Sequence, residues 1–125
     1  VTPNESEAAL LSGRAVTSVD DAEAAARILL ARGAGAVAVT LGAAGALYVD
    51  GATVTRIDGL SAGPVVETTG AGDAFNGGLA VALSEGSEIG AALRFANATA
   101  ALSVTRAGAA PSMPDRAAID ALLAR

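Results

Sequence analysis

The residues best placed for chemistry lie in a glycine-rich stretch between positions 68 and 78, where a carboxylate directly follows a Gly-Ala-Gly sequence. The stretch is Thr-Thr-Gly-Ala-Gly-Asp-Ala-Phe-Asn-Gly-Gly. Glycines let an anion approach the backbone without a Cβ in the way, and amides at a helix N-terminus point outward. The pattern therefore predicts an anion-binding turn at Gly70, Ala71 and Gly72. Asp73 would lie beside it as a base that takes a proton from a bound hydroxyl.

The same stretch also has a purely structural interpretation. The chain has 15 glycines, so a Gly-x-Gly pattern can arise by chance, and Asp73 would then be a first-turn acid favoured by the helix dipole. Two familiar phosphate motifs are excluded. A dinucleotide fingerprint needs glycine where Phe75 stands, and a P-loop needs lysine where Gly78 stands, whereas all eight basic residues are arginines.

The composition limits the chemistry that is available. The chain has 125 residues, enough for one domain, and carries a net charge of −5 from 13 acidic and 8 basic residues, which argues against a nucleic-acid partner. It has no cysteine and no histidine, so disulfides, a Cys/His zinc site and an imidazole base are excluded. Catalysis would have to use carboxylates, backbone amides and cations bound to oxygen.

Patterns of apolar residues predict a cytoplasmic protein with no membrane partner. No run reaches the roughly 18 apolar residues of a membrane span, and no basic-then-apolar leader opens the sequence. The apolar residues are mainly alanine and valine, which predicts a core of small side chains under closely packed helices. Val1-Thr2-Pro3 resembles the end of a strand, so we expect earlier strands of the fold to precede it.

Hydrophobic spacing and capping residues predict an α/β layered fold with helices against a sheet. Asn4 and Glu7 form a capping-box pattern at the start of the first helix. The predicted helices run from Asn4 to Gly13, from Ser18 to Gly33, from Gly70 to Glu85, from Ser87 to about Thr105, and onward from Pro114. The predicted strands cover 36–41, 46–50 and 53–57, with a tight turn at 42–45, a hairpin at Asp50-Gly51 and a loop over 108–113.

Several segments together match one protein family in order and over nearly the whole chain. Residues 67–77 match the signature Asp-Thr-Thr-Gly-Ala-Gly-Asp-x-Phe-x-Gly, with Glu67 as the one departure. Residues 4–7 match Asn-x-x-Glu, residues 40–45 match Thr-Leu-Gly-x-x-Gly, and residues 94–98 and 101–109 are also similar. The chain resembles the C-terminal half of the ribokinase-like, PfkB-type carbohydrate kinases. The resemblance implies the C-terminal part of their layered fold, without the N-terminal strands and the lid.

The resemblance implies that the γ-phosphoryl group of ATP is transferred to a sugar hydroxyl, with ribose and ribose 5-phosphate as the first candidates. Asp73 falls on the catalytic base of the family, and Gly70, Ala71 and Gly72 on its anion-binding amides. A homodimer of the complete protein is also implied. One alternative stays open: a noncatalytic nucleotide-binding module, or an inactive fragment of a kinase for another sugar or nucleoside. The sugar-contacting residues of the family lie in the half that this chain lacks.

The resemblance also implies a nucleotide site and a magnesium-bound water arranged by Asn4 and Glu7. The implied nucleotide positions are Asn4, Glu7, Thr40, Leu41, Gly42, Ala43, Ala44, Gly45, Gly72 and Asn97. Each group has a structural alternative: a capping box for the first pair, an ordinary strand turn for 40–45, and a link between helices for Asn97. Ala43 and Ala44 replace the polar residues of many relatives, which predicts weaker side-chain contacts with ATP.

A potassium site is the last implication of the resemblance. In the family, oxygens next to the anion-binding turn hold this ion, and most of them are carbonyls. The matching positions are Glu67, Thr69, Ser103, Arg106, Gly108 and Ser112. Glu67 stands where the family usually has aspartate, and its longer side chain could displace the carboxylate ligand. The alternative for Glu67 is a solvated residue at the end of a strand.

Overall fold

The structure is a computed structural model that describes residues 1–108 and 113–125. The chain folds into two compact units, Val1–Asp58 and Gly59–Arg125, which are described in turn. Among the described residues, no helix is long and apolar enough to cross a membrane.

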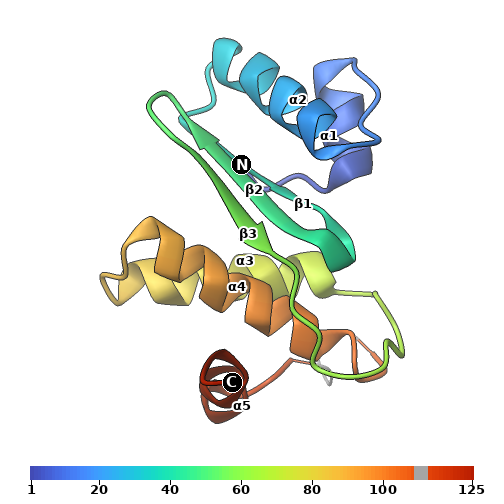
Figure 1. The fold of residues 1–125 in the computed structure, drawn as a ribbon, viewed down its shortest axis with the longest axis vertical. Coiled ribbons are helices and arrows are strands. Elements are labelled where there is room, and N and C mark those ends of the chain that lie inside the picture. The colour runs from blue at the N-terminus through green and yellow to red at the C-terminus, as the bar shows by residue number, and fades with distance from the viewer. Residues whose placement is uncertain (109–112) are drawn as a thin grey trace. The chain divides into compact units, whose positions relative to one another are not determined.

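The first unit is a three-stranded antiparallel sheet with two helices (Figure 1). The strands β1 (Ala36–Thr40), β2 (Gly45–Asp50) and β3 (Val54–Asp58) follow one another in the order β1-β2-β3. The helices α1 (Glu5–Ser12) and α2 (Val19–Ala31) precede them. All five elements agree with the sequence prediction to within a residue or two, and the predicted α/β arrangement of a sheet flanked by helices is confirmed.

The first residues of the chain run parallel to β1. The Ala38 amide donates to the Val1 carbonyl at 2.9 Å, and the Thr40 amide donates to the Pro3 carbonyl at 2.9 Å. Asn4 then forms a parallel bridge with Thr40. This pairing brings the start of α1 to the end of β1, where the turn toward β2 begins.

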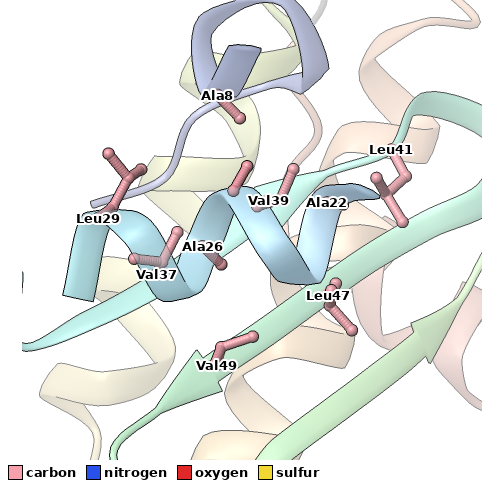
Figure 2. Packing of buried hydrophobic residues seen from close by; sticks show 10 residues of the cluster. Ala8, Ala22, Ala26, Leu29, Val37, Val39, Leu41, Leu47 and Val49 are labelled. Carbon is pink, nitrogen blue, oxygen red and sulfur yellow. The ribbon is translucent and has the colours of Figure 1, made fainter. Parts of the chain in front are cut away.

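Small apolar side chains form the core of the first unit, as the composition predicted. On α2, Ala22, Ala25 and Ala26 are fully buried. Figure 2 shows the side chains of α2 and of β1 and β2 lying between the helix and the strands. Alanine keeps the helix surface flat, so α2 can lie close to the valines and leucines of the sheet. The buried cluster is Ala8, Ala22, Ala25, Ala26, Leu29, Val37, Val39, Leu41, Leu47 and Val49.

The second unit contains the helices α3 (Ala71–Ser84), α4 (Ile89–Ser103) and α5 (Arg116–Leu123). Figure 1 shows α3 and α4 side by side. Gly78 permits this close contact, because a Cβ there would lie 2.6 Å from Thr99 Oγ1 and 3.1 Å from the Cα of Ala96. The position of α3 is therefore set by its packing against α4.

Helix α5 is held by one arginine and an apolar contact. The Arg116 guanidinium lies 4.8 Å from the centre of the Phe95 ring, and its Nη1 is 2.8 Å from Glu85 Oε2. Its Nε also donates to Asp120 at 3.2 Å. Ile119 and Leu122 are buried against the same cluster as Phe95. All three helices thus contribute residues to one buried cluster.

Two predicted helix starts were wrong, whereas the tight turn predicted at 42–45 is present. Glu88, not Ser87, caps α4, because the Glu88 side chain accepts a hydrogen bond from the Ala91 amide at 2.9 Å. Asp115 caps α5 in the same way, so Pro114 lies before the helix instead of inside its first turn. The turn at 42–45 contains a 3₁₀ helix, Gly42–Ala44. Of the loop predicted over 108–113, residues 109–112 lie outside the described residues.

Candidate active site

The glycine-rich stretch forms the N-terminus of α3, as the sequence predicted. Gly70 precedes the helix with φ +81° and ψ 1°, a left-handed conformation that glycine adopts without a Cβ clash. No side chain in the described part of the chain caps α3. By contrast, Asn4, Ser18, Glu88 and Asp115 cap the other four α-helices through their side chains. The first-turn amides of α3 are therefore not covered by a side-chain cap.

Two of these amides are left without an acceptor in the described part of the chain. The Ala71 amide donates to the Thr68 carbonyl at 3.2 Å, and the Ala74 amide donates to the Gly70 carbonyl at 2.9 Å. The amides of Gly72 and Asp73 lie between them in the first turn, where helix geometry provides no acceptor. Within the first turn, the available donors are thus those of Gly72 and Asp73, while the Ala71 amide closes the turn. The predicted donor role of Ala71 is therefore wrong, and the Gly70 amide, which precedes the helix, donates to no backbone acceptor among the described residues.

The surroundings of this turn are open. The Asp73 residue is exposed and lies in the first turn of α3. A Cβ at Gly72 would meet no other atom of the described residues within 4 Å. The packing of the protein itself therefore gives no reason for glycine at position 72. An open amide turn beside an exposed carboxylate can bind an anion and accept a proton.

Glu67 connects the approach to α3 with the end of α4. Its Oε2 accepts a hydrogen bond from the Gly108 amide at 2.7 Å. This bond, together with a second one from the Thr69 side chain, holds the pKa of Glu67 below its ordinary value. The amides of Val66 and Glu67 both donate to the Val104 carbonyl, at 2.7 and 3.2 Å. The segment before the glycine turn is thus tied to α4 by backbone and side chain.

The structure brings together part of the predicted potassium site. Glu67, Thr69 and Gly108 are neighbours through the bonds just described. The Ser103 carbonyl accepts from the Arg106 amide at 3.3 Å, and the Ser103 hydroxyl donates to the Ala100 carbonyl at 2.8 Å. Ser112 lies outside the described residues. The oxygens present are of the kind that a hard cation takes, although the carboxylate of Glu67 is already engaged by the Gly108 amide. A potassium site here stays a prediction.

In the first unit, Asn4 and Glu7 form a complete capping box. Asn4 Oδ1 accepts from the Glu7 amide at 2.8 Å, and Glu7 Oε1 accepts from the Asn4 amide at 3.0 Å. The structural alternative for this pair is therefore confirmed. Both residues are exposed, so a role toward the nucleotide phosphates or a magnesium-bound water stays a prediction.

The turn after β1 lies beside this capping box, although the two are far apart in the sequence. The Leu41 amide donates to the Gly45 carbonyl at 2.8 Å, and the Ala44 amide donates to the Leu41 carbonyl at 3.1 Å. Gly42 has φ +57° and Gly45 φ +101°, so both glycines are needed to close the turn. The bridge between Asn4 and Thr40 places the start of α1 at the beginning of this turn.

The remaining residues of the predicted nucleotide site differ in exposure. Ala43 and Ala44 are exposed, whereas Leu41 is 6% exposed and belongs to the core of the first unit. Asn97 lies on α4 and is 6% exposed. This burial is consistent with the structural alternative, in which its side chain links helices by hydrogen bonds. Its predicted place beside the nucleotide stays a prediction.

Sequence reasoning missed two carbonyl groups that shape the site. The Thr68 carbonyl takes up the Ala71 amide, and the Val104 carbonyl anchors the segment before α3. Backbone acceptors carry no signal in a sequence, and the link from Glu67 to Gly108 spans 41 residues. Such contacts become visible only when the chain is folded.

The fold and the turn define a class: an α/β protein with a glycine turn at a helix N-terminus that carries an acid in its first turn. The family follows from comparison with known proteins. The chain belongs to the pfkB family of carbohydrate kinases, whose family model matches residues 1–116. It is 41% identical over 116 residues to the ribokinase of Haemophilus influenzae, an alignment that covers 93% of this chain and 38% of that protein.

Solved structures of the family agree. The ribokinase of Arabidopsis thaliana, in complex with ribose and ATP, matches with a TM-score of 0.92 and 38% identity over 98% of this chain and 39% of that chain. The phosphofructokinase-2 of Escherichia coli, in complex with potassium, matches with a TM-score of 0.86 and 28% identity, covering 99% and 40%. The chain therefore spans about two fifths of the length of these relatives.

Proposed function

We propose that this protein acts in the transfer of the γ-phosphoryl group of ATP to a sugar hydroxyl, with ribose as the first candidate acceptor. The observation that carries the proposal is the N-terminus of α3, where an exposed carboxylate lies beside two amides that have neither an acceptor nor a side-chain cap among residues 1–108 and 113–125. The match to the pfkB family of carbohydrate kinases over residues 1–116 supports ATP and a sugar as the substrates.

In the proposed reaction, Asp73 accepts the proton of the sugar hydroxyl as its oxygen attacks the γ-phosphorus. The bond from that phosphorus to the oxygen bridging to ADP breaks, and ADP leaves. The amides of Gly72 and Asp73 stabilise the negative charge that spreads over the moving phosphoryl oxygens. A positioned general base contributes about 10²–10⁴-fold in rate, and the left-handed Gly70 fixes the direction of the amides.

In the first unit, we assign the nucleotide role to the capping box and the turn at 40–45. Glu7 uses Oε1 in the cap, so Oε2 is the oxygen that would arrange a water bound to Mg²⁺, an ion that tends to keep its waters. Around the turn, the exposed Ala43 and Ala44 offer only methyl groups and backbone. Nucleotide contacts there would rest on the backbone. Asn97 in the second unit is proposed as a further contact.

We also propose that potassium activates the reaction. The candidate ligands that the structure describes are the oxygens of Thr69, Ser103, Arg106 and Gly108, whereas the Glu67 carboxylate is already engaged by the Gly108 amide. The E. coli phosphofructokinase-2 in complex with potassium supports this proposal, because 99% of the present chain aligns with 40% of that protein. A cation held by these oxygens would supply positive charge next to the turn before α3.

A second candidate function is nucleotide binding without catalysis. The chain spans only 38% of the H. influenzae ribokinase. In this second candidate function, Asp73 has the position of the catalytic base, but the chain lacks the residues that bind the sugar. The acceptor is open in the same way, since the matches include a phosphofructokinase as well as ribokinases. Nucleotide binding without sugar-dependent release of ADP would favour this candidate.

The decisive experiment measures ADP formation from Mg-ATP with and without ribose, in potassium buffer, beside an Asp73→Asn variant. We expect ribose-dependent turnover that falls by about 10²–10⁴-fold in the variant, while nucleotide affinity measured by calorimetry stays within a factor of about two, because Asn has the same size. Retained activity in Asp73→Asn would exclude the base role. A folded protein that binds ATP but does not turn over would establish the second candidate.

A further inference from the structure

The carboxylate of Glu67 has a structural task that the family signature does not specify. It accepts the Gly108 amide at 2.7 Å and a hydrogen bond from the Thr69 side chain. These two residues are far apart in the sequence: Thr69 directly precedes the glycine turn, and Gly108 follows α4. One side chain therefore links the approach to α3 with the segment after α4.

The length of this side chain matters. The backbone of Glu67 is already fixed, because its amide and that of Val66 both donate to the Val104 carbonyl. From this fixed backbone, the carboxylate reaches Gly108 at hydrogen-bond distance. Aspartate is one methylene shorter, about 1.5 Å, which exceeds the tolerance of a hydrogen bond. A shorter carboxylate at position 67 would leave the Gly108 amide without this acceptor.

We propose that Glu67 is a positioning residue, whose hydrogen bonds to Gly108 and Thr69 fix the orientation of the amides of Gly72 and Asp73. This inference rests on the proposed function for its consequence in turnover, but the positioning itself is independent of catalysis. In this role, the Glu67 side chain holds the segment before α3 against the segment after α4. Any cation at this site would then be bound by other oxygens.

Two conservative substitutions separate positioning from direct binding of a cation. Glu67→Gln keeps an oxygen acceptor at the same reach and removes the charge, whereas Glu67→Asp keeps the charge and removes the reach. Positioning requires reach, so the glutamine variant should resemble the wild type and the aspartate variant should not. A carboxylate that bound the cation directly would contribute its negative charge, and aspartate stands at this position in the family signature, so direct binding predicts the larger loss in the glutamine variant.

The first measurement is amide NMR of the ¹⁵N-labelled protein in both variants, with thermal melting to confirm that each is folded. In Glu67→Asp, we expect hydrogen exchange at the Gly108 amide to accelerate about tenfold or more, since a lost bond of about 1.4 kcal/mol corresponds to that factor. The amide shifts of Gly72 and Asp73 should move in the same variant. In Glu67→Gln, both should stay close to the wild type.

The second measurement is turnover. We expect kcat to fall about tenfold in Glu67→Asp, because misplaced donors weaken transition-state binding, with KM for ATP within about twofold. Unchanged Gly72 and Asp73 shifts in the aspartate variant would overturn the proposal, as would a glutamine variant that shows the larger loss. If the wild type shows no turnover while the shifts follow the predicted order, the proposed function fails and the positioning role stands.

Discussion

The N-termini of α1 and α3 solve the same problem in opposite ways. A helix start leaves amides without partners. In α1, the side chains of Asn4 and Glu7 close the helix start in a reciprocal capping box. In α3, Gly70 brings no side chain, and the amides of Gly72 and Asp73 have no acceptor within the described residues. The start of α1 is stabilised by its own side chains, whereas the first-turn amides of α3 have no side-chain cap.

This difference separates stability from function. A cap contributes about 1 kcal/mol, and α3 does without it although its glycines also disfavour a helix. Its position instead depends on packing against α4 and on the hydrogen bonds around Glu67. A helix start that gives up its own cap and is held from outside is typical of an anion-binding site.

The largest expected effect distinguishes two left-handed glycines. Gly70 has φ +81° at the start of α3, and Gly13 has φ +74° at the end of α1. Each Gly→Ala substitution should cost about 1–2 kcal/mol of unfolding free energy, because alanine is strained at positive φ. Only Gly70→Ala should also reduce turnover, by about 10²-fold, since it misdirects the amides. Chemical denaturation and ADP release measure the two effects.

Equal losses of turnover in both variants, after correction for the folded fraction, would remove the distinction between the two helix ends. Loss in Gly70→Ala alone would sharpen it.

The next effect tests whether packing holds the uncapped helix. Gly78→Ala should destabilise the protein by about 1–3 kcal/mol, because overpacking forces neighbours to move. The new Cβ would meet Thr99 Oγ1 at 2.6 Å and the Ala96 Cα at 3.1 Å. Thr99 cannot easily turn away, since its hydroxyl donates to the Phe95 carbonyl at 2.8 Å. Chemical denaturation gives the value.

Gly77→Ala is the matched control in the same helix. A Cβ at Gly77 would meet nothing within 4 Å among the described residues, so this variant should stabilise α3 by up to about 1 kcal/mol. A destabilisation of similar size in both variants would contradict the role of packing.

A smaller effect separates the two roles of the capping box. Asn4→Ala removes the acceptor for the Glu7 amide and should cost about 1 kcal/mol of unfolding free energy. Glu7→Gln keeps the capping box, which accepts Glu or Gln at this position, so stability should change little. If Glu7 also arranges a magnesium-bound water, Glu7→Gln should raise the Mg²⁺ concentration needed for half-maximal turnover. An unchanged magnesium dependence would leave Glu7 with the cap alone.

The smallest effect concerns Asp50, a carboxylate that, unlike a first-turn acid at a helix start, accepts hydrogen bonds within its own turn. Asp50 accepts hydrogen bonds from the amides of Ala52 and Thr53 at 2.8 and 2.7 Å, and these bonds hold its pKa below its ordinary value. A lowered pKa in the folded state adds stability above the unfolded-state value, and this is lost as pH falls through the folded value. Unfolding free energy should therefore decline below about pH 4, and less steeply in Asp50→Asn. An identical acid slope in both proteins would exclude this contribution.

The sequence by itself determined the local elements of both units. The capping residues, the glycine at the end of α1 and the short apolar strand segments act over a few positions. Their patterns therefore predicted α1, α2 and the three strands to within a residue or two. The same holds for the glycine turn at Gly70. Where two neighbouring residues compete for one role, as Ser87 and Glu88 do at α4, local patterns did not choose correctly.

The tertiary structure alone decided which of these elements meet. It placed Asn4 beside Thr40 and joined Glu67 to Gly108. It also paired the Ala71 amide with the Thr68 carbonyl, whereas the amides of Gly72 and Asp73 have no acceptor among the described residues. The physical reason is that hydrogen bonds to backbone groups, and contacts between distant segments, depend on distance and direction in space. Every residue carries the same backbone, so these choices leave no trace in the order of side chains.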